Sequence, residues 1–105
     1  MLRSEPEAWV SSEPGITNQA AAFIASINPM AARANTWGLG AVPPIEVDRV
    51  FYDHVILLKE SGIYILETMN TVTSAEEDVH EFMFILGQAK IRGAAQMMIN
   101  PIAIW

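Results

Sequence analysis

The sequence predicts an α/β fold with a largely parallel or mixed sheet. Apolar residues at helical spacing alternate along the chain with short, continuous apolar runs of strand length. Their order is helix, strand, helix, strand, short helix and two strands, and such alternation is typical of α/β layers. The 105 residues suffice for one small domain with one core, so we expect a single domain over residues 1–105. Residues 1–12 show no clear period, and we expect them to be loosely held.

The first predicted helix runs from Gln19 to Ile27. Thr17 or Asn18 supplies a side-chain oxygen of the kind that caps helix starts, and Asn28-Pro29 is a stop signal. We expect the buried face of this helix to be formed by Ala22, Phe23 and Ile27.

The middle of the chain predicts a strand, a helix and a second strand. Met30 to Ala34 is the first strand, and it leads into the turn-like stretch Asn35 to Gly38. The helix is predicted over Glu46 to Glu60, because its apolar residues mark one face of about four turns. Gly62 suits the left-handed position after a helix, and Ile63 to Leu66 suits a strand buried on both faces. The apolar face comprises Val47, Val50, Phe51, Leu57 and Leu58, with His54 at the same spacing.

The last third of the chain predicts a short helix and two strands. Thr73 to Glu76 matches a capping box that opens a helix through Val79. Glu81 to Leu86 is the next apolar strand. The final segment, Ala94 to Trp105, contains Pro101, which marks an interruption or a sheet edge because proline cannot donate to a strand ladder.

Composition excludes several classes of protein. The net charge is −6 and the basic residues are scattered, which argues against nucleic acid, because phosphate recognition needs clustered basic side chains. The absence of cysteine excludes disulfides and thiolate sites and suits a cytoplasmic protein. No apolar run approaches the roughly 18 residues that suggest a membrane span. An apolar share of 51% is high for so short a chain, so we expect some apolar surface to be buried against a partner.

His54 and Glu67 are the first candidate site residues. The helix descends about 9 Å from His54 to Glu60, and the strand climbs back about 13 Å from Ile63 to Glu67, so the two side chains reach similar height. An imidazole beside a carboxylate suits a divalent metal or a proton-transfer pair. The alternative is a structural histidine held by a hydrogen bond, with Glu67 at a strand end.

Three further residues are candidates for lining a substrate pocket. Asn35 and Trp37 follow a buried strand, and polar residues at strand ends often line a ligand crevice in α/β sheets. Gln96, near the C-terminus, could also point into a pocket. The alternatives are a simple turn with Trp37 over the core, and a glutamine on a solvated face.

Four segments carry a resemblance to a known family: EPGITNQAAAFIA, ANTWGLGAVPP, DHVILLKESGIYILETMN and EFMFILGQAKIRGAAQMMINPIAI. From about Glu13 to Trp105, they resemble in order the C-terminal half of the cyclase family. These are metal-dependent hydrolases similar to bacterial kynurenine formamidase and isatin hydrolase. The most telling block joins a histidine, a Gly-Ile-Tyr run and a glutamate shortly before Met-Asn.

The resemblance implies a swivelling β/β/α fold, here only in part. It also implies an arylformamidase-like hydrolysis of amide or lactam bonds in small cyclic or aryl substrates. His54 and Glu67 resemble the family's later metal ligands, which implies a divalent metal such as zinc or manganese. Gln96 lies where members place small polar residues near the substrate.

The chain also departs from the family pattern. The main metal motif, HxGTHxDxPxH, has no counterpart here, Asn35 stands where members often have aspartate, and Gly40 where they have an acidic residue. We therefore expect a truncated member that binds metal weakly and is inactive alone. Because the missing half would cover part of the sheet, we expect a homodimer or higher homo-oligomer. The alternatives are a non-catalytic binding or assembly module and one half of a split enzyme.

Overall fold

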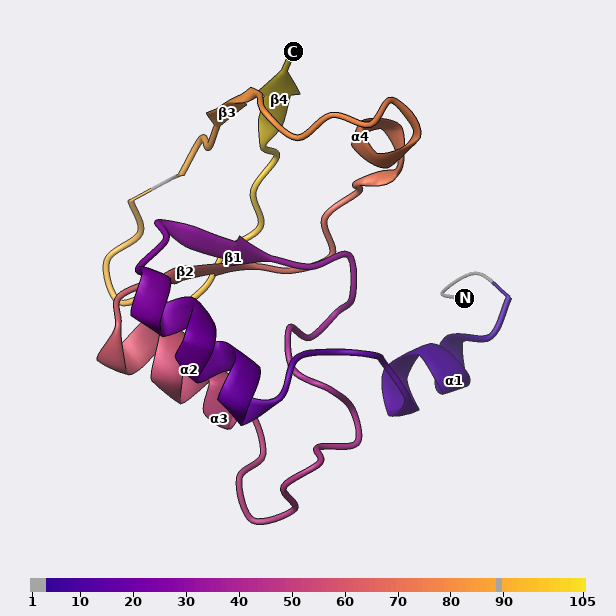
Figure 1. The fold of residues 1–105 in the computed structure, drawn as a ribbon, viewed down its shortest axis with the longest axis vertical. Coiled ribbons are helices and arrows are strands. Elements are labelled where there is room, and N and C mark those ends of the chain that lie inside the picture. Colours follow the sequence, from indigo (N-terminus) through magenta and orange to yellow (C-terminus); the bar gives the residue numbers. More distant parts are fainter. Residues whose placement is uncertain (1–3, 89) are drawn as a thin grey trace. The chain divides into compact units, whose positions relative to one another are not determined.

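The computed structural model describes residues 4–88 and 90–105, in which helices and short strands follow one another as a mixed α/β chain (Figure 1). Contacts between backbone positions divide the chain into two compact units, residues 1–70 and 71–105. The sheet is not continuous along the chain: one parallel pair of strands lies in the first unit and one antiparallel pair in the second.

Helix α2, Asn18–Ile27, forms as the sequence predicts. The Thr17 hydroxyl accepts a hydrogen bond from the Ala20 amide at 3.1 Å, and Asn28 ends the helix in the left-handed conformation. The predicted buried face is wrong, because Ala21 is the residue that is fully buried. The helix packs through this small side chain, which leaves Ala22, Phe23 and Ile27 exposed.

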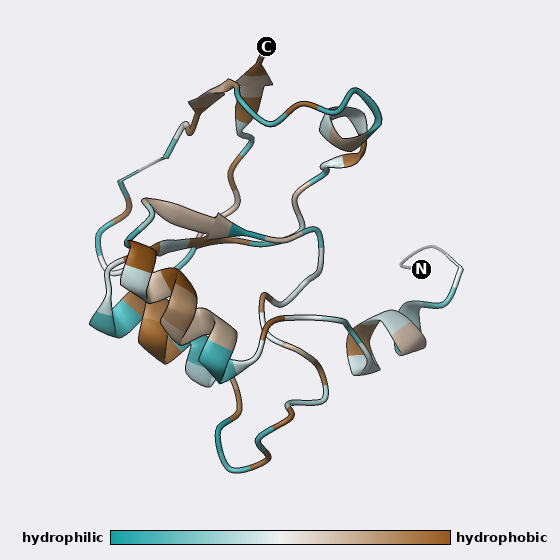
Figure 2. Cartoon of the chain, in the orientation of Figure 1, coloured by the Kyte–Doolittle hydropathy of each residue, from teal (hydrophilic) through white to brown (hydrophobic). Residues whose placement is uncertain are grey.

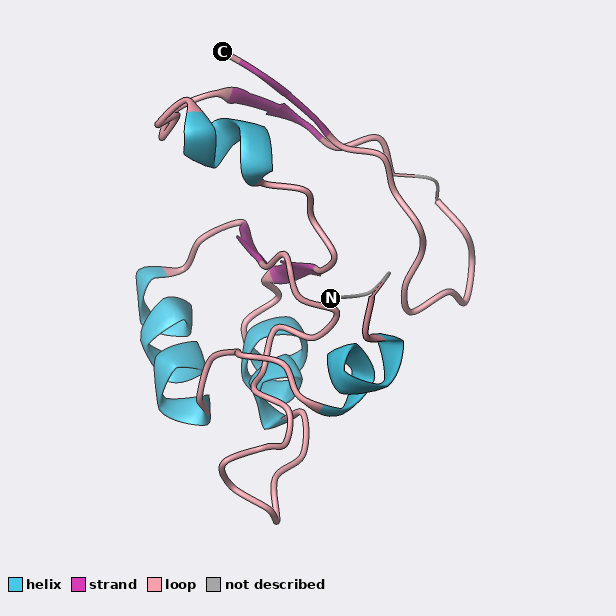
Figure 3. Ribbon diagram, turned by 90° about the vertical axis from the view of Figure 1, so that its right-hand side faces the viewer, coloured by secondary structure: helices cyan, strands magenta, loops and turns pink. Residues whose placement is uncertain are grey.

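Strands β1, Ala31–Arg33, and β2, Tyr64–Leu66, pair in parallel. The pairing extends past the strands, since the Ala34 amide donates to the Leu66 carbonyl. Burial of β2 on both faces is wrong: Leu66 is buried, whereas Tyr64 is 46% exposed. Figures 1 and 3 show why, because α2 and the following helix lie on the same side of this pair.

The second helix is shorter than the sequence predicts. It consists of α3, Tyr52–His54, and a π-helix, η1, Val55–Glu60. Phe51 adopts a left-handed conformation with φ 54°, which interrupts any helix entering from its N-terminal side. The residues before it form turns, and Val47, expected on the buried face, is 80% exposed.

The end of η1 turns the chain directly into β2. Gly62 has the predicted left-handed conformation, with φ 68°. The Ile63 amide donates to the Leu57 carbonyl at 2.9 Å, and the Ser61 hydroxyl donates to the Ile56 carbonyl at 2.7 Å. These bonds satisfy carbonyls that a widened helix end leaves free. The core of the unit collects around this turn and comprises Ala21, Leu39, Leu57 and Ile63.

A loop-to-loop pairing holds the segment before α2 against the segment that follows β1. The backbones of Glu13 and Val42 exchange two hydrogen bonds of 2.9 Å. Gly15 faces this segment so closely that a Cβ there would lie 2.2 Å from the carbonyl carbon of Gly40. Glycine is therefore required at position 15 for lack of space. Residues 1–12, expected to be loosely held, include a short helix, α1, Pro6–Ser11.

The second unit contains α4, Val72–Glu76, and the strands β3, Met83–Ile85, and β4, Ile102–Ile104. The capping box is wrong, because the helix begins before Thr73, has no side-chain cap and ends before Val79. Both strands lie within the predicted segments, but β4 begins only after Pro101, as the missing donor of proline favours. None of the described helices combines the length and apolar character that spanning a bilayer requires.

The packing of the core predicts that truncating two adjacent leucines lowers the free energy of unfolding by very different amounts. Leu57→Ala should lower the free energy of unfolding by about 2–5 kcal/mol, because a fully buried side chain leaves a cavity. Leu58, 47% exposed, is the matched control, and Leu58→Ala should cost less than about 1 kcal/mol. Urea unfolding followed by circular dichroism measures both. Equal losses would contradict the described packing.

Candidate functional site

His54 lies between two carboxylates. Its Nδ1 is 3.1 Å from Oδ2 of Asp53, and its Nε2 is 3.3 Å from Oε1 of Glu67. The first contact is a hydrogen bond, and the second is an ion pair only when the imidazole is protonated. His54 ends α3 and Glu67 directly follows β2, so the turn at the end of η1 brings together the two residues singled out in the sequence.

Glu67 is fixed by the backbone of a distant segment. Its Oε1 accepts a hydrogen bond of 2.8 Å from the amide of Leu39. Leu39 is a core residue with 4% exposure, so this amide is itself held in place. The Glu67 side chain is 28% exposed and that of His54 is 32% exposed, so solutes can reach the pair.

Asp53 is the residue of the site that the sequence did not single out. It is 3% exposed, and its carboxylate packs against Gly40, where a Cβ would lie 2.8 Å from Oδ1. The available signal was a carboxylate next to a histidine within an apolar helix, since a buried charge requires a partner. Gly40, which has no side chain, provides the space that Asp53 occupies.

A neutral imidazole can donate a hydrogen bond to only one of the two carboxylates. An ionised carboxylate only accepts, so the contact with Asp53 requires a proton on Nδ1 of His54. A neutral ring then presents the unprotonated Nε2 to Glu67, and both atoms of that contact are acceptors. A second proton on the ring, or a cation shared by Nε2 and Oε1, makes the contact attractive.

The spacing of Nε2 and Oε1 fits two ligands of one metal ion. Two corners of a tetrahedral zinc site are about 3.3 Å apart, because each ligand atom lies about 2.0–2.1 Å from the metal; His54 and Glu67 are separated by 3.3 Å. The Asp53 bond to the other ring nitrogen matches the carboxylate–histidine arrangement that orients metal ligands. Within residues 4–88 and 90–105, however, no three His, Asp or Glu side chains are grouped to hold a metal.

An aromatic row connects Trp37 to His54. The rings of Trp37 and Phe51 meet edge to face with centroids 6.2 Å apart, and those of Phe51 and His54 do so at 5.6 Å. The Trp37 indole donates to the Trp9 carbonyl of α1 at 2.9 Å. Trp37 thus lies behind Phe51, which forms the apolar wall beside the imidazole.

The other two predicted pocket residues lie elsewhere. Asn35 is exposed in the bend after β1, and no hydrogen bond or charge contact in the described part of the chain joins its side chain to His54 or Glu67. Gln96 is an exposed residue of the second unit, where it lines a shallow hollow with Lys90 and Arg92.

No family model, curated protein or solved structure matches this chain. The chemistry of the site rests on its own side chains: one histidine, two carboxylates in contact with it, and an aromatic wall.

The close approach of Gly40 to Asp53 predicts that a single methyl group disturbs the imidazole. In Gly40→Ala the carboxylate must move, because the new Cβ would lie within 3.0 Å of both its oxygens. The Nδ1 bond of His54 should weaken, which changes the ring ¹⁵N chemical shifts. Gly38→Ala is the matched control, since the nearest atom to its Cβ would be 3.7 Å away. Unchanged ring shifts in Gly40→Ala would contradict the described geometry.

Proposed function

We propose that this chain supplies one wall of the active site of a metal-dependent amide hydrolase of the cyclase type, and that it is inactive alone. The observation that supports the proposal is the placement of Glu67 Oε1 at 3.3 Å from His54 Nε2, with Asp53 on the opposite ring nitrogen. The proposal includes a cytoplasmic location, which the absence of cysteine suits.

His54 and Glu67 would hold the metal, zinc or manganese. Such an ion supplies a Lewis acid and an activated water for attack on an amide carbonyl. Asp53 orients the ring and keeps Nε2 free to bind, while the Leu39 amide holds Glu67 in position. A catalytic zinc needs about three protein ligands, so a second polypeptide carrying the remaining ligands would complete the site.

Exposed apolar strand residues support a homo-oligomer as the form of the protein. One face of the β3–β4 pair carries side chains that are 43–58% exposed, and Figure 2 colours both strands toward the hydrophobic end of its scale. We call it the ribbon face; it comprises Met83, Ile85, Ile102 and Ile104. Two-stranded pairs are marginal in water unless an apolar face is covered. The same feature favours the second candidate function, a non-catalytic assembly module.

Metal binding tests the proposed site. Isothermal calorimetry with zinc or manganese should detect one weak site per chain, and His54→Ala should abolish it, because Nε2 is lost. His80→Ala is the matched control, since His80 is an exposed histidine that contacts only Asp78 by hydrogen bond and charge in the described structure. The control should bind like the native chain.

Two results of this calorimetry would overturn the proposal. One is no detectable heat with either metal at millimolar concentration, which would favour the assembly module. The other is equal loss in His54→Ala and His80→Ala. Hydrolysis of N-formylkynurenine by the chain alone would contradict the proposed inactivity but support the proposed chemistry.

Oligomerisation predicts the effect of a charge on the ribbon face. The native chain should be a dimer or larger by light scattering at micromolar concentration, and Ile102→Lys should shift it toward monomer, because a charge cannot be buried there without a partner. Val47→Lys, on an 80% exposed residue outside the ribbon face, should leave the mass unchanged. A native monomer would contradict this part of the proposal.

A further inference from the structure

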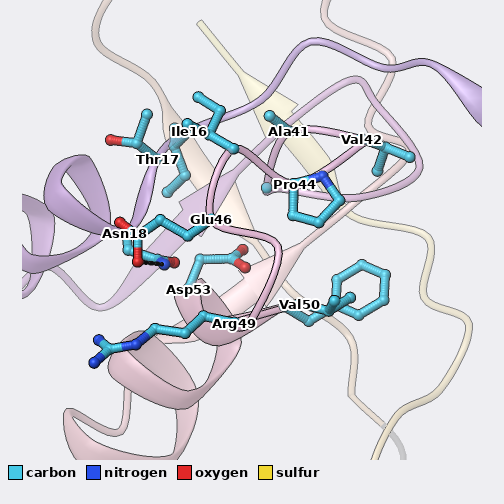
Figure 4. Close-up of a pocket in the computed structure, with 13 residues that line it drawn as sticks. Ile16, Thr17, Asn18, Ala41, Val42, Pro44, Glu46, Arg49, Val50 and Asp53 are labelled. Atoms are coloured by element: carbon cyan, nitrogen blue, oxygen red, sulfur yellow. Dashed lines mark hydrogen bonds between the residues drawn. The ribbon is translucent and has the colours of Figure 1, made fainter.

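A cavity of about 90 Å³ opens in the first unit beside Asp53, between the start of α2 and the loop that precedes α3 (Figure 4). Most of its lining residues are apolar, from Ile16 on one side to Val50 and Phe51 on the other. The charged residues of the lining are Glu46, Arg49 and Asp53.

Asp53 lines this cavity, and one of its two carboxylate oxygens has no hydrogen-bond partner among the described residues. Its Oδ2 contacts His54, whereas Oδ1 accepts no hydrogen bond from any described residue. Every fully enclosed side-chain oxygen or nitrogen in the described part of the chain does have a partner. Oδ1 therefore keeps some accessible surface, although the Asp53 side chain is only 5% exposed. A carboxylate removed from water to this degree favours a hydrogen-bonding cation.

The other charged lining residues are already engaged. Glu46 accepts a hydrogen bond of 3.1 Å from the Asn18 side chain, and the Arg49 guanidinium lies 4.8 Å from the centre of the Tyr52 ring. Figure 4 shows the Arg49 side chain extending away from the Asp53 carboxylate. Arg49 therefore does not pair with Asp53 Oδ1, and a cation from outside can.

We propose that this cavity binds the ammonium group of a short primary amine, with Asp53 Oδ1 as its acceptor. The apolar lining contacts the carbon chain of the amine. A metal ion fits less well, because it requires several oxygen or nitrogen ligands and most lining residues offer carbon. This site requires no metal at His54 and is independent of the proposed hydrolase function.

The cavity volume limits the size of the amine. A cavity of about 150 Å³ accommodates benzene, which has six heavy atoms, so a volume of about 90 Å³ suits a ligand of about four heavy atoms. n-Propylammonium has that size, and 1-propanol is its neutral counterpart with the same number of heavy atoms.

Titration by ¹H–¹⁵N NMR in the presence of EDTA tests the proposal on the full chain. Propylammonium chloride should bind at least about tenfold more tightly than 1-propanol, because a charge-assisted hydrogen bond contributes more than a neutral one. Sodium chloride at equal concentration controls for ionic strength. The largest shifts should fall on the amides of Ala41 and Val50. Equal affinity for the two ligands, or shifts spread evenly over the chain, would overturn the proposal.

Variants locate the binding. Asp53→Asn should remove the preference for propylammonium over 1-propanol. If that variant fails to fold by circular dichroism, Ile45→Trp decides, because residue 45 lines the cavity while being 70% exposed. It should weaken binding about tenfold by filling the opening. Val47→Trp, in the same loop but outside the lining, is the matched control. Equal effects of the two tryptophans would overturn the proposal.

Discussion

The first unit depends on the close packing of α2 against η1 at Ala21 and Leu57, both of which have no exposed surface. A methyl side chain lets two helices approach closely enough to enclose a leucine. The candidate site residues are connected to this contact on both sides. His54 immediately precedes η1, and the bond from the Ile63 amide to the Leu57 carbonyl starts the return toward Glu67. The site is thus positioned by a very small core.

Features decided by neighbouring residues could be predicted from the sequence, whereas features decided by packing could not. The cap of α2 at Thr17 and the left-handed Gly62 are local, and both occur as predicted. The buried face of α2 depends on the element against which it packs. Because η1 lies close to α2, the small Ala21 is buried there and the larger Phe23 is exposed. The left-handed Phe51 has no local signal, because such a conformation is uncommon for a bulky residue, and so the predicted helix from Glu46 was too long.

In the candidate site, too, some residues are placed by local geometry and others by packing. His54 and Glu67 could be paired because the rise along a helix and the return along a strand are fixed quantities. Asp53 could not be added from spacing, since adjacent residues on a helix point in different directions. Its role follows from burial against Gly40, a contact between segments 13 residues apart that only the folded chain reveals. Asn35 is not part of the candidate site, because the bend after β1 leaves it exposed.

The double use of Glu67 Oε1 couples the site to the core. The same oxygen accepts a hydrogen bond from the Leu39 amide and faces His54. A cation that bound this oxygen would therefore weaken the hydrogen bond that holds the buried Leu39. Binding and core order are then linked reciprocally. A tightly held Leu39 would restrict how far Oε1 can move toward a cation, and a cation that moved it would weaken the Leu39 hydrogen bond. Core order and cation binding would then oppose each other at this oxygen, so a cation bound there would lower the local stability of this small unit.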